Sequence, residues 1–214
     1  TLTKPEADAL RARLRPQIKP ANWPADLYTV PSLFLVAAAL GMHEELRPVV
    51  ERWPDDRYRK DDWTDHYHQP QMVIFGLGDP AVVEKHIRRL KLPLKTPVHV
   101  RGWLAHTEAR VLDVVRDSIL GVTNNEEAEK LVEAFSVVHA PEAAGPMLEL
   151  HLKSKAPKAA RRWLEANAGH AVAGLVGVAS VRGGLADAAI EMLRSFKKRG
   201  LEKQIAQAVE QLPK

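Results

Sequence analysis

The chain has 214 residues, of which 45% are apolar and 27% charged, the composition of an ordinary soluble globular protein. It contains no cysteine, which excludes disulfide bonds, thiolate metal sites and a cysteine nucleophile. Its best apolar run, residues 30–40, is shorter than the about 20 residues that span a bilayer and lacks the basic start of a signal peptide. We therefore expect a cytoplasmic protein.

The basic residues are concentrated in the last third of the chain. Residues 151–214 hold 12 Lys and Arg against 5 Asp and Glu, a net charge of +7, whereas residues 1–150 hold 19 against 22, a net charge of −3. A basic segment can mark a phosphate-rich partner, but it is also typical of a solvated helix face. The absence of specific nucleic-acid-binding motifs favours the solvated face.

The first predicted helix covers residues 4–14, with Thr3 as its N-cap and Pro5 in its first turn. Residues 15–24 contain three prolines and predict irregular chain. A second helix is predicted to begin at Pro31, and because it is apolar nearly all round we expect it to be buried on several sides.

Gly41 ends the second helix, and residues 44–53 are predicted to form its antiparallel partner, with Pro48 near the helix start. Residues 54–69 are charged and aromatic without apolar periodicity. They predict a loop that is longer than usual between helices.

Capping residues mark several helix starts in the middle of the chain. Asp79 and Thr96 each precede a proline, the pattern of an N-cap followed by proline at the first helical position. Thr107 and Glu108 are predicted to open another helix, and Asn124 or Asn125 to cap the next. The predicted helices cover residues 81–91, 98–106, 109–120 and a segment ending near residue 138.

The last third reads as one helix after another, with predicted spans 141–153, 157–168, 170–181, 185–199 and 201–212. Glycines at 169, 183, 184 and 200 stand where helix ends are expected. Connections of a few residues force neighbouring helices to be antiparallel.

Two internal echoes indicate repetition. Residues 76–81 (GLGDPA) resemble residues 184–189 (GLADAA), and residues 103–106 (WLAH) resemble residues 163–166 (WLEA). Helix pairs that recur along a chain are typical of solenoids. The prediction is an all-α, antiparallel helical-repeat layer of the HEAT or armadillo kind, with about 10–12 helices. It is one continuous domain, with N-terminal helices in 1–53, a loop at 54–69 and the main stack in 70–214.

The segments 102–108 (GWLAHTE), 117–120 (DSIL) and 140–172 resemble the helical region of large bacterial proteins related to MolR, which often combine a WGR domain with a domain called DUF4132. The resemblance covers roughly residues 70–205 and is most specific in 140–180, at 154–157 (SKAP) and 160–164 (ARRWL). It implies a helical-repeat module from a larger multidomain protein. It brings no catalytic residues, and the WGR motif itself is absent.

The segment that most resembles a metal-binding or catalytic site is 62–68 (DWTDHYH). His66 and His68, spaced as H-x-H, could bind zinc or nickel together with Asp65 or Asp62. The alternative is that the aromatic residues of this segment only anchor a long loop. We favour the alternative and predict no metal and no cofactor.

Five other histidines have simpler explanations. His99 and His106 are seven residues apart on one predicted helix, too far for one metal, and we expect hydrogen-bonding roles for them. His139, His151 and His170 lie near predicted helix ends or faces, where the helix dipole can stabilise a histidine without any function.

Two clusters of basic residues are candidates for phosphate contacts on one edge of the stack. They are Lys153, Lys155, Lys158, Arg161 and Arg162, and then Arg194, Lys197, Lys198, Arg199 and Lys203. The nearby aromatics, Trp163 and Phe196, are better explained as core residues than as base-stacking platforms.

No catalytic motif is present, so the sequence predicts a non-catalytic scaffold that binds a protein partner or other domains of the same polypeptide. The first alternative is nucleic-acid binding through the basic clusters, and the remote alternative is a metal-dependent enzyme using residues 62–68. The sequence leaves the oligomeric state open.

Overall fold

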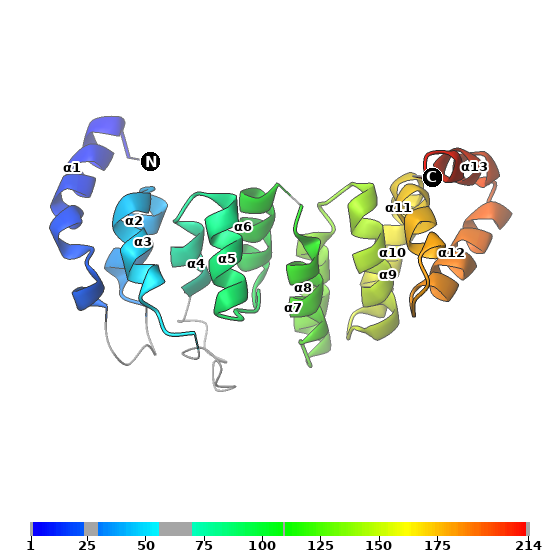
Figure 1. Cartoon of the computed structure of the whole chain (residues 1–214), viewed down its shortest axis with the longest axis horizontal. Coiled ribbons are helices and arrows are strands. Elements are labelled where there is room, and N and C mark those ends of the chain that lie inside the picture. The colour runs from blue at the N-terminus through cyan, green and yellow to red at the C-terminus, as the bar shows by residue number, and fades with distance from the viewer. Residues whose placement is uncertain (1, 24–29, 56–69, 109, 213–214) are drawn as a thin grey trace. The chain divides into compact units, whose positions relative to one another are not determined.

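The computed structural model describes residues 2–23, 30–55, 70–108 and 110–212. Within these ranges the chain forms 13 α-helices and three short 3-10 helices and contains no strand, which confirms the all-α prediction (Figure 1). The count exceeds the expected 10–12, and one added helix is the short α4 (Pro70–Phe75). No helix in the described ranges is both long and apolar enough to cross a bilayer.

The helices form two compact units. The first unit comprises residues 1–93 and 105–108, and the second comprises residues 94–104 and 109–214. Helix α6 (Pro97–Thr107) contributes to both units. The division falls next to Pro93.

The first unit is built from α1 (Lys4–Leu14), the 3-10 turns η1 (Arg15–Gln17) and η2 (Pro20–Asn22), α2 (Ser32–Ala39), α3 (His43–Glu51), α4 and α5 (Pro80–Arg89). Helix α2 packs against α3 and α4, and α4 packs against α5. Phe34, Leu46 and Ile74 are fully buried between these helices. At one end of the core, Trp23 contacts Phe34 and Trp53, with ring centroids 4.7 and 4.6 Å away.

Local capping explains where several of these helices begin. The Thr3 backbone N–H donates to Glu6 Oε2 over 2.8 Å, which starts α1 at the predicted residue. Asp79 Oδ1 accepts from the N–H groups of Ala81 and Val82 and starts α5 as predicted.

Two expectations for the first unit are wrong. Helix α2 is not buried on several sides, because only Phe34 and Ala37 within it are buried and Val36 is 39% exposed. Pro48 lies inside α3 rather than near its start. A proline there removes one backbone donor from the helix.

The second unit contains residues 97–104 of α6, then α7 (Leu112–Leu120), α8 (Asn125–Phe135), the turn η3 (Pro141–Ala143), α9 (Ala144–Lys153), α10 (Pro157–Ala166), α11 (Ala168–Ser180), α12 (Ala186–Lys198) and α13 (Glu202–Glu210). Helix α7 begins at Leu112, not at residue 109 as predicted. Glu108 adopts a left-handed conformation with φ of 50°, which no α-helix can continue through.

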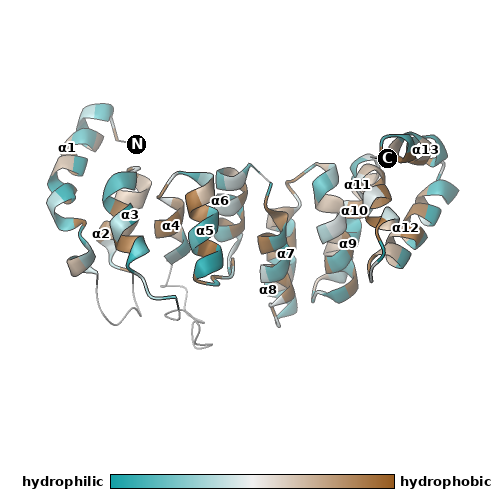
Figure 2. Ribbon diagram, in the orientation of Figure 1, coloured by the Kyte–Doolittle hydropathy of each residue, from teal (hydrophilic) through white to brown (hydrophobic). Residues whose placement is uncertain are grey.

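Helix α11 is at the centre of the C-terminal part of this unit. It packs against η3, α9, α10, α12 and α13. Helix α12 buries Ala189 and Phe196 and carries both apolar and polar residues along its length (Figure 2). Helix α13 buries no residue, and its Val209 is 53% exposed.

Candidate interaction groove

The start of α9 and the middle of α11 approach each other unusually closely. A Cβ atom added at Gly174 would lie 2.0 Å from Pro141 O and 2.7 Å from Ala144 Cβ. Glycine is therefore required at position 174, because any side chain there would overlap the backbone of η3. On the next turn, a Cβ at Gly145 would lie 3.2 Å from Val178 Cγ2.

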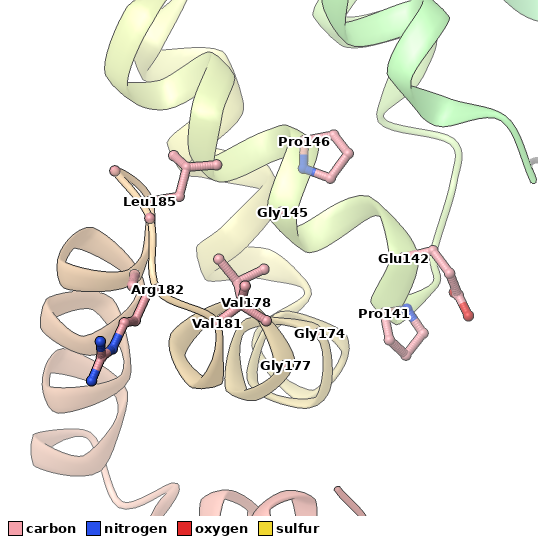
Figure 3. A pocket seen from close by; sticks show the side chains of 13 residues that line it. Pro141, Glu142, Gly145, Pro146, Gly174, Gly177, Val178, Val181, Arg182 and Leu185 are labelled. Carbon is pink, nitrogen blue, oxygen red and sulfur yellow. The ribbon is translucent and has the colours of Figure 1, made fainter. Parts of the chain in front are cut away.

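Beside this contact the surface of the second unit is hollowed into an open groove of about 700 Å³. One wall comes from η3 and the start of α9, and the other from the end of α11 and the turn into α12 (Figure 3). The apolar lining includes Pro141, Pro146, Val178, Val181 and Leu185. Val181 is 66% exposed, so the groove presents apolar surface to solvent.

The floor of the groove includes a second glycine of α11. Gly177 lies one turn after Gly174, but a Cβ added to it would meet nothing within 4 Å. The two glycines therefore differ. Gly174 packs against η3 within the chain, whereas Gly177 leaves the backbone of α11 open to the groove.

The lining carries two charged side chains of opposite sign, Glu142 and Arg182. They stand on opposite sides of Val178 and Val181 (Figure 3). Among the residues that the structure describes, neither has an ion-pair partner. The groove thus combines an apolar floor with one acidic and one basic flank.

The predicted basic residues are half neutralised within the chain. Five of the ten form ion pairs with carboxylates, namely Lys153–Glu149, Arg161–Glu165, Arg162–Glu129, Arg194–Glu191 and Lys197–Glu202. Within the described ranges no ion pair is formed by the other five, Lys155, Lys158, Lys198, Arg199 and Lys203. Arg199 lies over the Phe196 ring, 5.8 Å from its centroid.

The structure does not bring the two basic clusters together. The first lies at the α9–α10 connection and the second at the α12–α13 connection. Three antiparallel helices separate these connections, so they fall at opposite ends of the helices (Figure 1). The clusters therefore do not form one edge. Trp163 and Phe196 are buried, as expected for core residues.

The predicted metal-site residues Asp62, Asp65, His66 and His68 lie outside the described residues. Within the described residues, no group of three or more His, Asp or Glu side chains is placed to hold a metal ion.

The histidines of α5 and α6 are more buried than the sequence indicated. His86 and His99 are each only 2% exposed, and burial lowers the pKa of both to about 4. We expected His99 to form hydrogen bonds, but neither of its ring nitrogens has a partner in the described part of the chain. His106 stacks on Phe75 with centroids 5.5 Å apart, and burial lowers its pKa.

Sequence reasoning missed the groove. Its residues are small and apolar, and they come from positions 141–146 and 174–186, which nothing in the sequence connects. The available signal was a pair of glycines three residues apart inside a predicted helix, where glycine is unfavourable without a packing reason.

Comparisons of the chain with known protein families, with curated proteins and with solved structures found no match.

Proposed function

We propose that this chain is a non-catalytic interaction module that binds a segment of a protein in the groove of the second unit. The supporting observation is the groove itself, in which the exposed Val181 and partly exposed apolar side chains line a hollow between α9 and α11. Exposed apolar surface of this kind is typical of protein-binding sites.

The architecture that we propose is a helical repeat of the HEAT or armadillo kind. Helices α9 to α12 support it, because they follow one another through connections of only a few residues and each packs on its neighbour. We also propose, from the sequence resemblance, that the module belongs to a larger bacterial protein related to MolR. In such a protein the bound segment could come from another domain of the same polypeptide.

Nucleic-acid binding is the less favoured alternative. Half of the candidate residues already pair with carboxylates, and the two clusters lie at opposite ends of the helices. Phosphate tracking requires several unpaired cations along one path. An enzymatic role would depend on Asp65, His66 and His68, which the structure does not describe.

The proposal is tested by selecting binders from a library of 16-residue peptides displayed on phage, and then measuring their affinities by fluorescence anisotropy. Val181→Asp places a charge in the groove at a 66% exposed position and should weaken the selected peptides at least tenfold. The matched control is Val137→Asp, since Val137 is 61% exposed, also follows a helix end, and lies in the same unit outside the groove.

Selected peptides that bind Val181→Asp as tightly as the unchanged chain would contradict the proposal. A library without binders, together with DNA or RNA binding that weakens steeply as salt rises, would support the nucleic-acid alternative instead.

A further inference from the structure

Gly177 has no role in the packing of the chain itself. Glycine weakens a helix relative to alanine, so a glycine inside α11 calls for a reason. The reason is plain for Gly174, whose missing side chain makes room for Pro141 O. At Gly177 no atom of the chain lies within 4 Å of the place a Cβ would occupy. The space above it belongs to the groove.

A missing Cβ lets another backbone come close. An extended segment would gain little there, because it binds through backbone hydrogen bonds to a sheet edge and α11 uses its own N–H and C=O groups within the helix. A second helix needs no such bonds. It packs by fitting its side chains between those of its neighbour, and small residues at the crossing allow the closest approach.

The charges on the two flanks of the groove place a second requirement on the molecule that binds there. Glu142 and Arg182 stand on opposite sides of the groove (Figure 3). Both are exposed, and neither has an ion-pair partner in the described ranges. An occupant that complements them carries a basic residue on one flank of its apolar face and an acidic residue on the other.

We propose that the groove binds one amphipathic α-helix of a protein partner, crossing α11 at Gly177 with a small residue and pairing its flanking charges with Glu142 and Arg182. This inference rests on the proposed function and specifies the class of partner. The helix lies over the partly buried Val178 and the exposed Val181, which its apolar face covers. Its small residue faces the open backbone of Gly177.

The test uses the fluorescein-labelled 16-residue peptides that depend on Val181, with Gly177→Leu as the blocking variant. Leucine is a good helix former, and a Cβ at this position meets no atom within 4 Å and faces the groove, so the fold should persist. Binding should weaken at least tenfold. Gly169→Leu is the matched control, because Gly169 is also in α11 with nothing within 4 Å and does not line the groove.

A second variant tests the charges independently of the floor. Arg182→Glu should weaken peptides that carry an acidic residue on the corresponding flank at least threefold. Exchanging that residue for lysine in the peptide should restore binding. Circular dichroism of the bound peptides should show helix.

Each result separates this inference from the proposed function. Peptides that depend on Val181 but bind Gly177→Leu normally, or that bind equally well with proline at their centre, would overturn the helix and leave groove binding intact. The absence of any peptide that depends on Val181 would overturn both.

Discussion

The two units hold their helices together by different means. In the first unit, long polar side chains reach backbone carbonyls far away in sequence. Arg89 donates to Trp53 O over 2.7 Å and to Val50 O over 3.0 Å, and Arg11 donates to Leu40 O over 2.9 Å. In the second unit many of the charged pairs join residues one helical turn apart, and α11 packs closely on η3, where Gly174 leaves room for Pro141 O.

The difference follows from the connections. A helix end leaves up to four carbonyls without helical partners. In the first unit, Arg89 of α5 donates to the carbonyl of Val50, in the last turn of α3, and to that of Trp53, just after the helix. In the second unit the connections from α9 to α12 are short, and small residues allow adjacent helices to approach directly. Close approach at a glycine also occurs in the first unit, where a Cβ at Gly76 would lie 2.4 Å from Ala38 Cβ. What distinguishes the first unit is therefore its long-range arginine donors.

Acid should destabilise both units, and this is the largest expected effect. His86 in the first unit and His99 in the second have pKa values lowered from 6.5 to about 4, chiefly by burial. The unfolded chain therefore binds more protons than the folded chain between pH 6.5 and 4, and stability present above pH 6.5 is lost through that window. Each group contributes about 1.4 kcal/mol per pH unit, or roughly 3 kcal/mol at pH 4.

The two histidines can be separated by substitution. His99 lacks hydrogen-bond partners in the described residues, so His99→Leu should keep stability at pH 7.5 and reduce the acid dependence by one proton. His86 receives N–H groups of Arg89 at Nδ1 over 3.3 Å, so His86→Leu should lower stability at neutral pH as well. Urea unfolding at pH 7.5, 6, 5 and 4.5 measures both. If the free energy of unfolding of His99→Leu depended on pH as steeply as that of the unchanged chain, the lowered pKa of His99 would not explain the loss of stability in acid.

Arg89→Met tests the polar bracing of the first unit. The variant keeps most of the side-chain volume but removes the donors to the end of α3 and the contact with Asp55. Two part-buried carbonyls lose charged donors, so the free energy of unfolding should fall by about 3 kcal/mol.

The control for that variant is an arginine of the second unit. Arg161 pairs with Glu165 one turn away and its side chain is 57% exposed, so Arg161→Met should change stability by less than about 0.5 kcal/mol. Denaturation followed by circular dichroism compares the two. Equal losses would mean that the contrast between the units is not a matter of long-range donors.

Several helix starts could be predicted from local signals in the sequence, whereas the contacts between helices could not. Thr3, Asp79 and Asn124 act on residues two or three positions away. The sequence identified Thr3 and Asp79 and narrowed the third cap to Asn124 or Asn125. The reach of Arg89 to residues 36 and 39 positions earlier has no local signal. The same holds for the groove, which depends on where Pro141 meets α11.

Two glycines of α11 offer the finest comparison, and the smallest expected effects. Gly174→Ala would place a Cβ 2.0 Å from Pro141 O, a backbone atom that cannot move without shifting η3. We expect a loss of about 2 kcal/mol in the free energy of unfolding. Gly177→Ala meets no atom within 4 Å and should instead stabilise the chain by about 0.5–1 kcal/mol, because alanine is the better helix former.

The sign of the two changes matters more than their size. Both variants make the same chemical change in the same helix, three residues apart, so differences in propensity and in the unfolded chain cancel in the comparison. Urea unfolding midpoints measured side by side give the signs. If Gly174→Ala were also stabilising, α11 would not touch η3 and the groove wall would be differently placed. If Gly177→Ala were destabilising, the chain itself would use the open backbone that we assign to a partner helix.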